Sequence, residues 1–150
     1  MAAGAWIFYN KGRKNLCNGG INLGTGTFRM ALFTSASNAG TVTLSTYGSL
    51  TPEVTNANGY TTLGVTLTGV TWTAGASAKQ MRFNCSAKFW SANAGSIASI
   101  KFAVIYTSGA SAGAKKLVCA SQLSTAQFTI TSGNRLTITP AATGIFNLAG

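Results

Sequence analysis

Hydrophobic and polar residues alternate along much of the chain, and the clearest run occupies residues 100–106. This segment reads Ile-Lys-Phe-Ala-Val-Ile-Tyr, so four large apolar side chains fall on one face of an extended chain. The other face is mixed and carries Lys101. The pattern predicts a central strand of an antiparallel sheet whose second face is only partly covered.

Shorter segments of the same kind on both sides of this run predict the other strands. They lie at residues 27–34, 65–67, 70–73, 80–84, 87–92, 116–120, 127–131, 135–139 and 145–148. The segment at 116–120 is expected to pair with 100–106 as a hairpin. Residues 127–131 and 135–139 flank the turn Ser132-Gly133-Asn134 and form the sharpest hairpin pattern in the chain.

Two short segments have a helical pattern instead. Residues 10–20 predict one or two helical turns, with Asn10 as the N-cap and Gly19 at the end. Residues 44–50 carry apolar side chains three positions apart, which predicts a second short helix. The alternation also changes register at Thr68-Gly69, where a bulge or tight turn is expected.

Together these elements predict an all-β fold. About 8–10 short strands with frequent turns indicate an antiparallel β-sandwich of jelly-roll or immunoglobulin-like type, with at most one or two short helices. A chain of 150 residues fits a single domain spanning residues 1–150. Within it, residues 1–20 are a candidate N-terminal arm or docking segment.

The composition favours a protein that is permanently packed against neighbouring proteins. Hydrophobic residues make up 46 % of the chain, which argues against disorder. Charged residues make up only 8 %, against about 25 % in a typical soluble domain. Glycine, alanine, serine, threonine and asparagine fill the surface instead, and such a surface costs little to desolvate.

The charge that is present is almost entirely positive. Eleven Lys and Arg residues face one acid, Glu53, which gives a net charge of +10. One interpretation is nucleic-acid binding through phosphate neutralisation. The other is a basic subunit that docks on an acidic protein surface. The cations are scattered along the chain and form two local clusters. The first contains Lys11, Arg13 and Lys14. The second contains Lys115 and Lys116 and is predicted to be a solvated hairpin tip.

The sequence excludes most catalytic and metal sites. It contains no His and no Asp, so neither a Ser-His-Asp triad nor a pair of catalytic carboxylates can be built within the chain. The three cysteines, Cys17, Cys85 and Cys119, contain no CxxC pair and are expected to be buried free thiols. We therefore expect a protein without enzymatic activity, without a bound metal and without a cofactor.

No secretory signal and no run of about 18 apolar residues is present, so an intracellular product without a membrane partner is expected.

Several segments resemble a family of small virion proteins from tailed bacteriophages. They are residues 5–12, 28–32, 58–62, 65–72, 102–106, 117–119, 131–138 and 144–146, in this order along nearly the whole chain. The resemblance implies a virion component without enzymatic activity. It brings no catalytic or ligand residues with it, and it leaves open whether the protein belongs to the head or to the tail.

The first hypothesis is a capsid decoration, or cement, protein that binds the outer head shell and stabilises it. Its partners would be the major capsid protein and further copies of itself in a homo-oligomer, and its location would be the virion, assembled in the host cytoplasm. The candidate interface residues are the N-terminal aromatic and basic residues and the second basic pair: Trp6, Phe8, Tyr9, Lys11, Arg13, Lys14, Lys115 and Lys116.

Three alternatives remain. The first is a tail or neck subunit, such as a tube, connector or fibre-base protein. The second is a nucleic-acid-binding module, which would gather cations and exposed aromatic side chains on one face; direct nucleic-acid contact is not the favoured interpretation. The third is a carbohydrate-binding sandwich, which would normally need acidic residues that this chain lacks. Cations spread over the surface with aromatic side chains buried would favour assembly over nucleic-acid binding.

Overall fold

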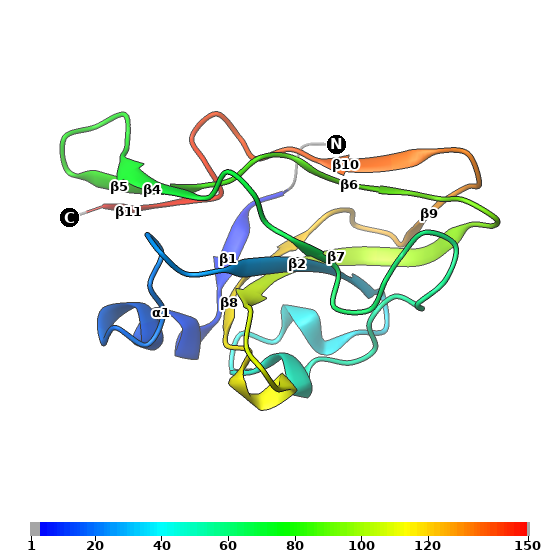
Figure 1. The fold of residues 1–150 in the computed structure, drawn as a ribbon, viewed down its shortest axis with the longest axis horizontal. Helices are drawn as coiled ribbons and strands as arrows, with labels where there is room; N and C mark the ends of the chain where they lie inside the picture. The colour runs from blue at the N-terminus through cyan, green and yellow to red at the C-terminus, as the bar shows by residue number, and fades with distance from the viewer. Residues whose placement is uncertain (1–3, 150) are drawn as a thin grey trace.

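Three antiparallel sheets form the fold in the computed structural model, which describes residues 4–149 (Figure 1). The elements in chain order are β1 (Trp6–Phe8), α1 (Asn10–Cys17), β2 (Phe28–Thr34), η1 (Asn38–Gly40), η2 (Tyr47–Ser49), β3 (Val65–Thr66), β4 (Thr71–Ala74), β5 (Gln80–Asn84), β6 (Lys88–Ser91), β7 (Ile97–Thr107), η3 (Ala112–Ala114), β8 (Leu117–Gln122), β9 (Phe128–Ile130), β10 (Arg135–Ile138) and β11 (Phe146–Ala149), where η marks a short 3-10 helix. The predicted all-β antiparallel sandwich is confirmed, with one strand more than the expected range. Residues 1–3 and 150, which belong to the predicted domain and in part to the predicted arm, lie outside the described residues.

The largest sheet has the strand order β1-β8-β7-β2-β3, and β9 also pairs with β7. The sheets β10-β6 and β11-β5-β4 lie on one side of it, and loops with the short 3-10 helices lie on the other (Figure 1). Strand β7 is the longest element and pairs with β2, β8 and β9. This confirms the central strand and its hairpin with β8.

Both faces of β7 are buried, so the expectation of a partly covered second face is wrong. Ala103 and Ile105 face the two small sheets within the larger core, while Val104 and Tyr106 face the loops and 3-10 helices. The register of β7 on β2 also shifts at Lys101. This bulge places the Ile100 side chain in the same cluster as Ile105, on the face opposite to the one that strict alternation predicts.

The predicted hairpin of residues 127–131 and 135–139 does not form. Strand β9 pairs with β7, whereas β10 pairs with β6 in another sheet. In the second pair Leu136 lies opposite Trp90, and both side chains are buried. The chain therefore crosses between layers at this turn. Alternation does not predict this crossing, because it specifies which face of a strand is buried but not which strand lies beside it.

The helical predictions were partly correct. Helix α1 forms, but its N-cap is Tyr9 and not Asn10, and Gly19 follows its end with a φ of 76°. Only the 3-10 helix η2 forms within residues 44–50. The irregularity expected at Thr68-Gly69 is a bend, with φ of 59° at Gly69, through which the chain leaves the largest sheet for β4. No helix within residues 4–149 has the length and apolarity needed to span a membrane.

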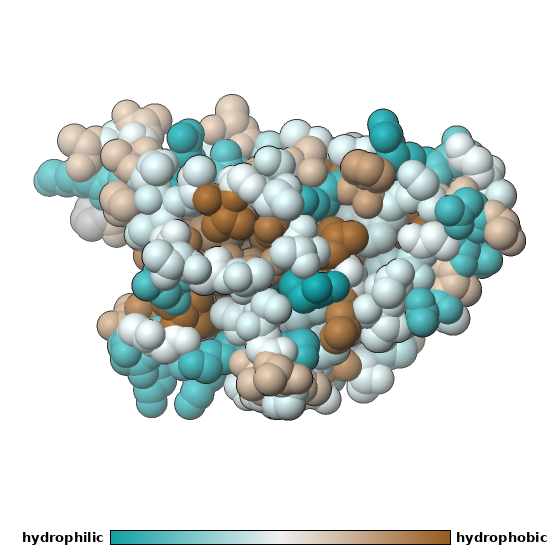
Figure 2. Space-filling view, in the orientation of Figure 1, coloured by the Kyte–Doolittle hydropathy of each residue, from teal (hydrophilic) through white to brown (hydrophobic). Residues whose placement is uncertain are grey.

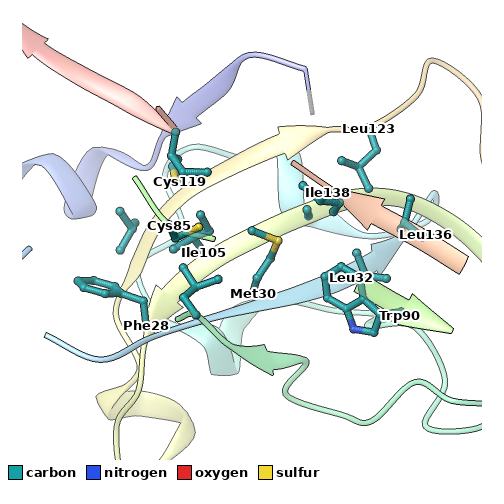
Figure 3. Close-up of a cluster of buried hydrophobic side chains, with 14 of the residues drawn as sticks. Phe28, Met30, Leu32, Cys85, Trp90, Ile105, Cys119, Leu123, Leu136 and Ile138 are labelled. Carbon is teal, nitrogen blue, oxygen red and sulfur yellow. The ribbon is translucent and has the colours of Figure 1, made fainter. Parts of the chain in front are cut away.

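The larger core lies between the sheets, and two of the three cysteines are part of it. Cys85 and the Cys119 side chain of β8 lie beside Ile105 and Met30 in this cluster (Figure 3). Both thiols are buried and free, as predicted, and burial raises the pKa of Cys85 to about 11. Cys17 is exposed at the end of α1, so the expectation of a buried thiol is wrong for this residue.

Candidate functional site

The N-terminal segment is held tightly against the largest sheet. Helix α1 crosses β8 at Gly12, where a Cβ atom would come within 2.7 Å of the Leu117 carbonyl oxygen and 2.9 Å of the Val118 carbonyl oxygen. The Tyr9 amide donates a hydrogen bond to the Val118 carbonyl at 3.1 Å. The buried Tyr9 hydroxyl donates to the Ala39 carbonyl at 2.6 Å. Tyr9 is therefore a core anchor and is not available to a partner.

The fold brings Lys116, from the second basic cluster, beside the helix that carries the first. The Lys116 ammonium donates a hydrogen bond to the carbonyl of Gly20, just beyond α1, at 2.7 Å. The three cationic side chains of α1 are exposed, and hydrophilic atoms cover the position of this helix at the lower left of Figure 2. We name Lys11, Arg13, Lys14 and Lys116 the basic surface.

Lys115 does not belong to this surface. Its side chain is buried, with 8 % of its area exposed, so the prediction of a solvated hairpin tip is wrong for this residue. Lys115 ends the 3-10 helix η3, and its carbonyl accepts a hydrogen bond from the Tyr47 amide at 2.9 Å. Lys115 is therefore enclosed by the loops that cover the face of the largest sheet opposite to the two small sheets.

The other aromatic candidates lie on or beside an edge strand. Trp6 and Phe8 are half-buried in β1, at the edge of the largest sheet, while Ile7 between them is 57 % exposed. The Phe8 ring packs edge-on against the Phe146 ring of β11 with centroids 4.3 Å apart. The Arg13 guanidinium lies 5.9 Å from the Phe8 ring centroid. These contacts connect the basic helix to the three-stranded sheet.

The remaining cations are distributed over the molecule. Arg29 donates hydrogen bonds to the carbonyls of Leu63 at 3.0 Å and Gly64 at 2.8 Å. Lys88 on β6 donates to a threonine hydroxyl at 2.6 Å. The Arg135 guanidinium on β10 lies 4.9 Å from the centroid of the exposed Phe89 ring. These three cations thus lie on β2, β6 and β10, away from α1.

The only acidic side chain of the chain, Glu53, takes part in an internal tyrosine network. Its carboxylate accepts hydrogen bonds from the Tyr47 and Tyr60 hydroxyls, and from the Leu63 amide at 2.9 Å. The Tyr60 hydroxyl accepts a hydrogen bond from the Leu32 amide of β2 at 2.9 Å. The network thus fixes the segment before β3 to the largest sheet.

The same network keeps its phenols protonated. Burial, followed by the hydrogen bond to Glu53 and its negative charge, raises the pKa of Tyr47 well above its usual value. Burial and the Glu53 charge do the same to the pKa of Tyr60. Burial also raises the pKa of Tyr106 to about 12, against the lowering influence of Arg29. The phenols therefore act as hydrogen-bond donors, Tyr47 and Tyr60 to the carboxylate and Tyr106 to the Leu63 carbonyl.

Sequence reasoning noted that Glu53 is alone but did not find this network. The available signal was the lone acid within seven residues of two tyrosines, Tyr47 and Tyr60. The network also affects the surface charge, because the single carboxylate side chain is half-buried and both of its oxygens accept hydrogen bonds. Every exposed ionised side chain within residues 4–149 is therefore cationic.

Comparisons with models of protein families, with curated proteins and with solved structures found no match to this chain.

Proposed function

We propose that this protein is a non-enzymatic structural subunit that docks on an acidic protein surface, as a decoration protein on the outer shell of a bacteriophage head. The observation that carries the proposal is the placement of its charges. The only carboxylate side chain is bound by Tyr47 and Tyr60, so the exposed charges of the described chain are all positive. Such a surface attracts an acidic partner and repels other copies until that partner is present.

The distribution of cations and aromatic side chains supports assembly over nucleic-acid binding. The cations are spread over α1, β2, the β4–β5 turn, β5, β6, β7, β10 and residues 115–116 before β8. Most large aromatic side chains are buried or half-buried, and among residues 4–149 Phe89 alone has an exposed aromatic ring. A single-strand binding surface would instead combine a continuous basic groove with several exposed aromatic rings.

The uncharged surface supports the same proposal. Serine, threonine, asparagine, glycine and alanine occupy most exposed positions, for example residues 110–114 and 141–143. Such side chains lose little hydration free energy when another protein covers them, so many small contacts can add up to stable attachment. The resemblance to tailed-phage virion proteins suggests the head shell, built from the major capsid protein, as the acidic surface.

The test is the location of the protein in purified virions. DNA-filled heads and tails would be separated, and the protein quantified by mass spectrometry against the major capsid protein. Hundreds of copies with heads, released by high salt, are expected. Recovery with tails would move the protein to the alternative tail or neck role. Recovery on DNA, or absence from particles, would overturn the proposal.

A further inference from the structure

The three-stranded sheet β11-β5-β4 extends beyond the core that it covers. One face of this sheet is apolar in two cross-strand rows. The first row contains Phe83 and Phe146, which are buried and stack with ring centroids 5.1 Å apart. The second row contains Met81 and Leu148, which are 38 % and 41 % exposed. The outer part of the sheet therefore presents an apolar face that nothing within residues 4–149 covers completely.

A groove of about 340 Å³ lies between the outer part of this three-stranded sheet and the end of α1. Figure 1 places the sheet above α1 at the left of the view, and Figure 2 shows hydrophobic atoms between them. The apolar and thiol side chains that line the groove are Leu16, Cys17, Ile21, Leu23, Trp72 and Leu148. This volume can receive one or two large apolar side chains.

The charges beside the groove indicate which partner fits it. Arg13 lies one turn before Cys17 on the same face of α1, and Cys17 lines the groove. Arg13 also contacts the Phe8 ring, which packs against β11. Lys14 occupies the last turn of the same helix. No acidic side chain lines the groove, so an acidic partner would find cations at its rim.

We propose that this groove binds an acidic, extended segment of the partner protein through one large apolar side chain. The inference rests on the proposed function and names the surface and the chemistry of its contact. β11 is an edge strand among the described residues, so an extended segment can lie along it and donate backbone hydrogen bonds. A second copy of this chain is a poor occupant, because it would bring like charges to the rim without any exposed acidic side chain to compensate them.

Cys17 provides a direct reporter of the groove. It is exposed and lines the groove, whereas Cys85 and Cys119 are buried, so a thiol reagent such as DTNB should modify Cys17 alone in the native protein. The probe is a short synthetic peptide of alternating glutamate and serine with one central leucine. At about ten times its Kd this peptide should slow Cys17 modification about tenfold. A peptide with alanine in place of leucine, or lysine in place of glutamate, should give little protection.

A pair of matched surface variants tests the same contact. Leu148→Ser removes an apolar side chain from the groove, and Val42→Ser removes one of similar exposure elsewhere, since Leu148 is 41 % and Val42 is 37 % exposed. Fluorescence anisotropy should give about tenfold weaker peptide binding for Leu148→Ser and unchanged binding for Val42→Ser.

The outcomes separate this inference from the proposed function. Equal affinity of both variants for the peptide, or peptide binding that leaves Cys17 reactive, would overturn the groove and leave the head location untouched. Protection of Cys17 in a protein that virions lack would support the groove and overturn the virion role. Protection by a single-stranded oligonucleotide, with no protection by the acidic peptide, would overturn the choice of an acidic protein segment.

Discussion

At the scale of single residues, we expect the hydrogen bonds accepted by Glu53 to stabilise the fold. Its carboxylate receives two phenol donors and one backbone amide in a partly buried site. Replacement by glutamine keeps the shape but removes the charge and places an amide donor among donors. Because hydrogen bonds to charged groups contribute about 1.5–3 kcal/mol each, we expect Glu53→Gln to lower the free energy of unfolding by about 2–3 kcal/mol.

Urea unfolding followed by circular dichroism would measure this loss. Tyr47→Phe is the matched control, because it removes one donor while Tyr60 and the Leu63 amide still bind the carboxylate. Its cost should lie at the lower end of the range for hydrogen bonds to charged groups, about 1.5 kcal/mol, because the carboxylate keeps two donors. Equal stability of Glu53→Gln and the unaltered protein would show that the network contributes nothing to stability.

The tyrosines predict a specific loss of stability at alkaline pH. All four, Tyr9, Tyr47, Tyr60 and Tyr106, have raised pKa values in the folded protein, mainly because of burial, and that of Tyr106 is about 12. In the unfolded chain they ionise near the usual value of about 10, so above that pH the unfolded state binds fewer protons than the native state. Stability is therefore fully present below about pH 10 and falls as the pH rises through 12.

Absorbance of phenolate near 295 nm, recorded together with circular dichroism, would test this prediction. No tyrosine should ionise at its usual pKa while the fold is intact, and phenolate should appear together with unfolding. A separate early rise in absorbance with native circular dichroism would contradict the burial of these rings.

Some residue-level features could be predicted from the sequence and others could not. The composition predicts a nearly uniform positive charge, because counting residues needs no coordinates. The burial of Lys115 depends on loops that fold over it from residues 44–50, far away in the sequence. The exposure of Cys17 likewise depends on where α1 ends and which of its faces lies against β8.

At the level of elements, the docking of α1 depends on Gly12. A Cβ atom there would meet two backbone oxygens of β8, and backbone cannot move aside as a flexible side chain can. We expect Gly12→Ala to destabilise the protein, since overpacking costs about 1–3 kcal/mol and outweighs the gain of up to about 1 kcal/mol in helix propensity.

Thermal unfolding and the rate of Cys17 modification would both report this change. The melting temperature should fall, and Cys17 should react faster because the helix that carries it loosens. Gly113→Ala is the control, because a Cβ atom at Gly113 meets nothing within 4 Å. A variant Gly12→Ala as stable as Gly113→Ala would mean that α1 is not closely packed on β8.

The positions of most strands followed from alternation, but their partners did not. Strand β2 divides its side chains between two cores as its pattern predicts, with Met30 on one side and Phe33 on the other. The bulge at Lys101 and the separation of β9 from β10 were missed. Both depend on long-range pairing, which is selected by the packing of buried faces and leaves little trace in a local segment.

At the scale of the whole molecule, the candidate site could be predicted only in part. The N-terminal cluster and Lys116 were singled out from the sequence as basic candidates, but their proximity results from the docking of α1 on β8 and the contact between Lys116 and Gly20. The groove brings together the end of α1, β4 and β11, which lie in three distant parts of the chain. No sequence pattern predicts such a meeting, because it arises from the stacking of two sheets.

The proposed electrostatic docking makes a prediction about position as well as total charge. Lys11→Gln with Lys14→Gln removes two positive charges from the basic surface, and Lys101→Gln with Arg135→Gln removes two from β7 and β10. The two double variants have the same net charge, so non-specific attraction to an acidic shell should weaken equally in both. If α1 lies at the contact, however, the first variant should bind phage heads stripped of the protein about threefold to tenfold more weakly than the second, because each contact charge contributes about 0.2–1 kcal/mol. Sedimentation of heads with each variant at several salt concentrations would measure the difference, which should shrink as salt screens the charges. Equal affinities would mean that the attraction belongs to the molecule as a whole, and the assignment of the contact to α1 would then be wrong.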